Sequence, residues 1–157
     1  MSNEVYGYFE GSEVSNKDLF FKFLEEKTGI GVKSILVSEL YNYPERMAPI
    51  DTESCIAFVV GDKPGKTNTS YLTDYVDYAL DTDIGFPCKG KARLQLLIDF
   101  LMTMIQEAKA TRFVVAITDS SQIEEVKTVN LAQLESKILA DFEECAPPDC
   151  LYDVVVG

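Results

Sequence analysis

Two uninterrupted apolar runs constrain the fold of this chain more than any other feature. Residues 55–60 and residues 113–117 are apolar throughout and rich in branched side chains, without the polar alternation of a half-buried strand. Runs of this length are typical of strands that are covered on both faces of a sheet. Residues 91–110 are apolar on most sides at helical spacing, which predicts a long helix packed against that sheet.

The remaining segments continue an alternation of strands and helices. Further strands are predicted at residues 4–9, 32–37 and 151–156, and further helices at residues 16–28, 71–80 and 131–145. Ser15 is the expected N-cap of the helix at 16–28, and Gly29 is its expected end. Residues 119–126 are expected to form a short helical or looped link. The pattern predicts an α/β sandwich with a central mixed sheet of about four to five strands and helices packed on it. We expect one globular domain over residues 1–157.

Charge is the strongest indication of function. The chain has 26 Asp and Glu residues against 14 Lys and Arg residues, a formal net charge of −12, and neither histidine nor tryptophan. Surplus negative charge opposes compaction but attracts a positively charged partner. The absence of histidine excludes Ser–His and Cys–His catalysis. Paired carboxylates remain possible, and Asp99 is either a buried functional acid or part of the polar edge of its helix with Gln95, Thr103 and Gln106.

The sequence also bears on location and on metals. The first residues lack a basic and an apolar region, and residues 94–105 fall short of the ~20 apolar residues that span a bilayer. We therefore expect a cytoplasmic protein with no membrane contact and with reduced cysteines. Cys55 is expected to be a core thiol. Cys145 and Cys150 have a spacing of C-x4-C, but zinc requires a second pair of ligands, so neither a metal nor a cofactor is expected.

Residues 61–67 (Gly-Asp-Lys-Pro-Gly-Lys-Thr) resemble a phosphate-binding loop, since they follow an apolar strand and end in Gly-Lys-Thr. Asp119, at the end of the second apolar strand, stands where such a site would hold magnesium. Only three residues separate the two glycines where the motif has four, and one of them, Pro64, has no N–H to donate. A type II turn is the alternative. Basic residues also cluster in this part of the chain: Lys63, Lys66, Lys89, Lys91 and Arg93. They could bind a small anion, or they merely relieve the local repulsion between acidic residues.

The segment at residues 71–83 combines acids with tyrosines. As a helix it would place Asp74, Asp77 and Asp81 on one face, an arrangement that weakens the helix. The expected partner-binding residues are Tyr71, Asp74, Tyr75, Asp77, Tyr78, Asp81 and Asp83, together with Glu143 and Glu144 at a helix end that disfavours acids. Alternatively, the tyrosines are core residues and the acids serve solubility.

These patterns predict a non-enzymatic, acidic protein inhibitor: an immunity protein or antitoxin that neutralises a basic toxin, with a nuclease as the expected target. A basic protein would be the partner, without direct binding of nucleic acid, although a mimic of nucleic acid is a variant of this hypothesis. The alternatives are a small nucleotide- or phosphate-binding enzyme that uses residues 61–67, and an acidic adaptor subunit.

Overall fold

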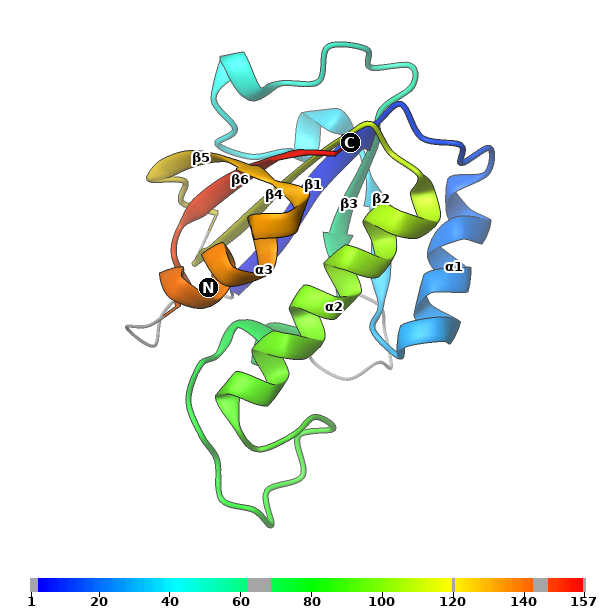
Figure 1. The fold of residues 1–157 in the computed structure, drawn as a ribbon. Coiled ribbons are helices and arrows are strands. Elements are labelled where there is room, and N and C mark those ends of the chain that lie inside the picture. Colours follow the sequence, from blue (N-terminus) through cyan, green and yellow to red (C-terminus); the bar gives the residue numbers. More distant parts are fainter. Residues whose placement is uncertain (1–2, 62–68, 120, 143–146, 157) are drawn as a thin grey trace.

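One mixed sheet organises the protein in a computed structural model that describes residues 3–61, 69–119, 121–142 and 147–156 (Figure 1). In the described residues the sheet has six strands in the order β2-β3-β1-β4-β6-β5. Neighbouring strands are antiparallel except β5 and β6, which are parallel. Their bounds are β1 (Asn3–Glu10), β2 (Val32–Ile35), β3 (Ile56–Val60), β4 (Arg112–Asp119), β5 (Glu125–Asn130) and β6 (Cys150–Val155).

Three helices cover one face of this sheet: α1 (Lys17–Thr28), α2 (Gly90–Ala108) and α3 (Leu131–Asp141) (Figure 1). Alternate strand residues point into the layer between helices and sheet, where Phe9, Phe58 and Phe113 lie in mutual ring contact at 5.6 to 6.4 Å between centroids. Burial of these rings and of the apolar side of α2 is the main driving force for this packing.

The chain between β2 and β3 covers the opposite face. It contains two short 3-10 helices, η1 (Val37–Glu39) and η2 (Glu45–Met47), and it buries Leu40 and Met47 against the sheet. The hydroxyl of the buried Tyr8 donates to the carbonyl of Met47 at 2.6 Å. Both β3 and β4 are therefore covered on two sides, which confirms the interpretation of the two apolar runs. Cys55 is a half-buried free thiol beside β3, and burial raises its pKa to about 12.

The ends of α1 follow ordinary capping chemistry. The side chain of Asn16, one residue later than expected, accepts a hydrogen bond from the Leu19 N–H at 3.1 Å. Gly29 ends the helix with φ of 77°, a left-handed conformation that glycine adopts without strain. The expected helices at 91–110 and 131–145 correspond to α2 and α3, and the strands expected at 4–9, 32–37 and 151–156 correspond to β1, β2 and β6.

Two expectations need correction. The described residues form six strands: β5 begins at the end of the expected link at 119–126 and continues through residues 127–130, for which no element is expected. The helix expected at residues 71–80 is absent: a short 3-10 helix, η3 (Thr69–Thr73), is followed by irregular chain up to Lys89. No helix within the described ranges is long and apolar enough to cross a membrane.

Candidate functional site

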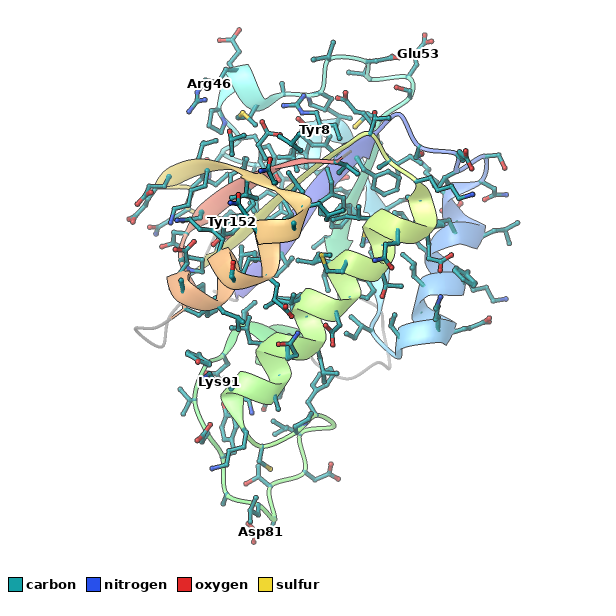
Figure 2. The ribbon with its side chains drawn as sticks, viewed as in Figure 1. Tyr8, Arg46, Glu53, Asp81, Lys91 and Tyr152 are labelled. Atoms are coloured by element: carbon teal, nitrogen blue, oxygen red, sulfur yellow. The ribbon has the colours of Figure 1, made fainter. Side chains whose placement is uncertain are left out.

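Residues 74–89, here called the acidic loop, project from the N-terminal end of α2 (Figure 1). Asp81 lies at the far end of this projection (Figure 2). The backbone N–H of Tyr78 donates to the carbonyl of Cys88 at 2.9 Å, which closes residues 78–88 at their base. A surface loop of this length with bonded ends is an Ω-loop, a structure whose own side chains give it a defined shape.

Arg93, in the first turn of α2, holds both limbs of the acidic loop to the helix. Its side chain has no solvent exposure, and its guanidinium lies 5.0 Å from the centre of the Tyr78 ring. All five N–H donors are used on backbone carbonyls: those of Tyr71 at 2.9 Å, Asp74 at 2.6 Å, Pro87 and Cys88 at 2.8 Å each, and Val76. The carbonyl dipoles replace water around this buried cation, so the loop conformation and the charge depend on each other.

Two of the four aspartates in the segment stabilise the loop itself. Asp77 accepts a hydrogen bond from the backbone N–H of Gly90 at 2.8 Å, and its second oxygen lies 3.5 Å from the Lys89 ammonium. The bond from Gly90 is the main reason that the pKa of Asp77 falls below its usual range. Asp74 accepts from the hydroxyl of Tyr78, which raises the pKa of Tyr78. Both carboxylates are therefore occupied by groups of this chain, although Asp77 is exposed.

The three tyrosines lie at the base of the loop, half-buried. The rings of Tyr71 and Tyr78 meet edge to face with centroids 5.8 Å apart. Tyr75 packs on Phe142, just after α3, at 6.0 Å. They therefore do not form one stripe beside the acids, as a helix would have required. Their packing orders the chain from which the loop projects.

The tip of the acidic loop is different, because its side chains face solvent. Asp81 and Asp83 are exposed and make neither a hydrogen bond nor an ion pair with any other described residue. Leu80, beside them, is 86 % exposed. The structure thus presents two available carboxylates next to a large apolar side chain. Leu80 was missed as a site residue, because its spacing in the sequence fits the buried side of a helix.

The remaining candidates are distributed as follows. Several candidates lie outside the described residues: Glu143, Glu144, and residues 62–67 of the segment that resembles a phosphate-binding loop, with Lys63 and Lys66. Lys89 and Lys91 are exposed, and Lys89 is near Asp77. Arg93 cannot contribute to an anion site, because its donors are saturated by carbonyls.

Asp99, Asp119 and the cysteines are the remaining candidates from the sequence. Asp99 is exposed and accepts from Gln95 at 2.9 Å, so it belongs to the polar edge of α2. Asp119 is exposed at the end of β4, and its backbone N–H donates to the side chain of Asp149 at 2.7 Å. Within the described ranges, no three Cys, Asp or Glu side chains are grouped in a way that could hold a metal ion. Cys88 and Cys150 are free thiols, and Cys145 lies outside the description.

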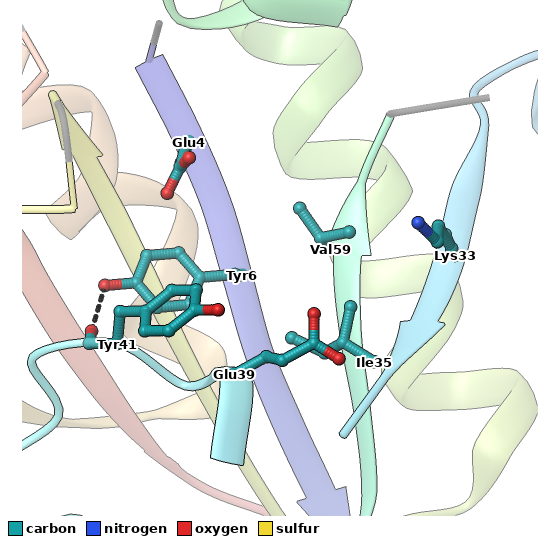
Figure 3. Close-up of a pocket in the computed structure, with 7 residues that line it drawn as sticks. All are labelled: Glu4, Tyr6, Lys33, Ile35, Glu39, Tyr41 and Val59. Carbon is teal, nitrogen blue, oxygen red and sulfur yellow. Dashed lines mark hydrogen bonds between the residues drawn. The ribbon is translucent and has the colours of Figure 1, made fainter. Parts of the chain in front are cut away.

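A pocket lies beside the 3-10 helix η1, on the sheet face opposite α1, α2 and α3. It has a volume of about 120 Å³ and is lined by Glu4, Tyr6, Lys33, Ile35, Glu39, Tyr41 and Val59 (Figure 3). Its lining combines carboxylates with aromatic and aliphatic side chains, whereas the acidic loop presents its carboxylates on a convex tip. The fold and these two features define the protein as an α/β domain with an acidic projection. Comparison with known protein families, curated proteins and solved structures finds no significant match.

Proposed function

We propose that this protein is an inhibitor that binds a basic protein and blocks its cleft with the acidic loop. As an immunity protein or antitoxin it would neutralise a toxin, with a nuclease as the expected target. The observation that carries the proposal is the projecting loop, which is fixed by Arg93 and presents Leu80, Asp81 and Asp83 to solvent.

Preorganisation supports this role. A loop already held in one shape loses little conformational freedom when it binds, so more of its interaction energy contributes to affinity. In this protein the carbonyls of both loop limbs are bound by one buried guanidinium, and the loop ends are joined between Tyr78 and Cys88. A projecting shape also suits insertion into a concave site, which a flat acidic surface would not reach.

The chemistry of the tip matches a cleft that binds nucleic acid. Such clefts carry Lys and Arg side chains for phosphate groups, and carboxylates are complementary to them in charge. The net charge of −12 accelerates the encounter with a basic protein over a longer range. Leu80 would lose its exposed surface in the complex, and full burial of such a side chain contributes ~1.5–3 kcal/mol.

The test begins with recovery of the partner from the native host at low salt, and its identification. Wild-type protein should inhibit that partner's activity at a one-to-one ratio, with an association rate that falls as salt increases. The double variant Asp81→Asn/Asp83→Asn should bind at least about tenfold more weakly, since hydrogen bonds to charged groups are worth ~1.5–3 kcal/mol each. Leu80→Ala should accelerate dissociation.

The matched control is Glu26→Gln/Glu53→Gln, which removes the same charge at exposed positions on α1 and between β2 and β3. It should retain inhibition. If the control and the loop variant lose affinity equally, the loop is not the binding element. Recovery of no basic protein, or inhibition that is independent of salt and of both loop aspartates, would contradict the proposed function.

A further inference from the structure

The pocket beside η1, on the sheet face opposite the three α-helices, has the chemistry of a receptor for a single cationic side chain. Tyr6, Ile35 and Val59 of three neighbouring strands form its floor. Glu39 from η1 and Tyr41 form one wall, and Glu4 lies at the start of β1 (Figure 3). An apolar floor with a few fixed polar groups is the usual composition of a specific binding pocket.

Both carboxylates are held in place by the protein. One oxygen of Glu39 accepts from the backbone N–H of Leu36 at 3.0 Å, which also caps η1. One oxygen of Glu4 accepts from the hydroxyl of Ser121. For each carboxylate the second oxygen has no partner among the residues that the structure describes. Oriented carboxylates with a remaining oxygen are ready to accept from a donor that enters the pocket.

The aromatic part of the pocket is also fixed. The Tyr6 hydroxyl donates to the carbonyl of Tyr41 at 2.6 Å, and Asn42, with φ of 64°, donates from its amide to the carbonyl of Ser121 at 2.6 Å. The first bond joins the wall to the floor, the second fixes the chain next to Tyr41, and Tyr41 remains 59 % exposed at the rim. Burial raises the pKa of Tyr6 to about 12, so its phenol adds no charge at neutral pH.

We propose that this pocket binds an arginine side chain of the basic partner, as a second contact besides the acidic loop; the source of that arginine rests on the proposed function. A planar guanidinium has five donors for carboxylate oxygens and can lie against the face of a tyrosine ring, which a compact ammonium does less well. Lys33, on the edge strand β2, also lines the pocket and has an interaction of its own, so its charge disfavours a cation beside it.

The first experiment uses the protein alone, so that it does not depend on any partner. N-acetyl-arginine methylamide is titrated while the backbone amides of residues 33–41 and 57–60 are followed by NMR. N-acetyl-citrulline methylamide, which has the same shape without the charge, is the ligand control. We expect saturable shifts at the pocket with the arginine compound and none with the citrulline compound.

Variants then assign the site. Glu39→Gln and Glu4→Gln keep a side-chain oxygen for Leu36 or Ser121, and each should weaken arginine binding about tenfold. Glu26→Gln, on the helical face, should have no effect, and Lys33→Gln should tighten binding because a like charge is removed. No saturable shift at the pocket, equal binding of citrulline, or weaker binding by Lys33→Gln would overturn the proposal.

The complex separates this proposal from the proposed function. With the recovered partner, Glu39→Gln should reduce affinity in addition to the effect of the loop variant, since the two sites are independent. If the loop variant loses affinity while Glu39→Gln does not, the pocket proposal fails and the inhibitor function stands. If arginine binds the isolated protein but no basic partner is recovered, the pocket is an arginine site and the inhibitor function fails.

Discussion

Replacement of Arg93 by methionine tests whether the acidic loop is held as the structure implies. Methionine fills most of the volume of the arginine stem but has no donor for the five carbonyls that Arg93 binds, four in the acidic loop and that of Tyr71 just before it. We expect the loop to open, because its carbonyls can regain hydrogen bonds only from water. The sheet and the rest of α2 should remain folded.

The magnitude follows from the number of bonds. Five hydrogen bonds to a charged group, at ~1.5–3 kcal/mol each, would sum to about the whole stability of a domain, ~5–15 kcal/mol. The variant avoids most of this cost because its loop opens and the carbonyls reach water. The free energy of unfolding should then fall by the value of one buried ionic network, ~3–5 kcal/mol. In a chain of this length such a loss lowers Tm by about 10 °C.

Two measurements check the prediction, and a matched variant controls it. Calorimetry gives Tm, and hydrogen exchange gives the protection of the Tyr78 amide, which donates to Cys88 at the base of the loop. Arg46→Met makes the same replacement at an exposed arginine and should change neither value. If Arg93→Met stays within ~2 °C of wild type and the Tyr78 amide remains protected, the loop is not anchored by this side chain.

Two further predictions concern the sheet and the start of α2. Gly7→Ala should cost ~3 kcal/mol in urea unfolding, since a Cβ there would meet the Val114 carbonyl and lie 2.8 Å from the Cα of Val115. Gly29→Ala is the control: nothing lies within 4 Å of its Cβ, but φ is 77°, so it should cost only ~1 kcal/mol. Equal costs for the two variants would contradict the close approach of β1 and β4 at Gly7. The Gly90 amide lowers the pKa of Asp77. The stability that the ionised Asp77 contributes is therefore fully present above the usual aspartate pKa of ~4 and is lost as pH falls through the lowered pKa. The exchange protection of Gly90 should therefore decrease on acidification, and Asp77→Ala should show the same loss at neutral pH; protection that is unchanged in that variant would refute the assignment.

The central part of the fold could be predicted because its signals are local. Apolar runs without alternation indicated β3 and β4, and the apolar length of α2 indicated the helix that lies on them. β5 was missed because it is an edge strand whose sequence, Glu-Val-Lys-Thr-Val-Asn, has only two apolar residues among six. Its parallel pairing with β6 joins residues about 25 positions apart in the chain, and no local pattern reports such a contact.

The wrong helix at residues 71–80 has a specific physical cause. The apolar positions there do repeat at helical spacing, but periodicity reports only which side chains become buried. The carbonyls of Tyr71, Asp74 and Val76 could serve a helix or a buried cation, and the fold supplies the cation. In the sequence Arg93 has no feature that distinguishes it from a surface base at a helix start. Its burial arises only when α2 packs beside this segment.

Because residues 71–80 do not form the expected helix, a different set of acids is available to recognise a partner. Had residues 71–80 formed a helix, Asp74, Asp77 and Asp81 would have shared one exposed face and would have been equivalent. In the structure the first two are bound by Tyr78 and Gly90, so reversing their charge would disturb the loop and would confuse a binding defect with a folding defect. Asp81 and Asp83 can be altered without breaking a described contact. A charge count identifies an acidic segment, but only the satisfied hydrogen bonds of the fold separate carboxylates that build the loop from those that remain available to another molecule.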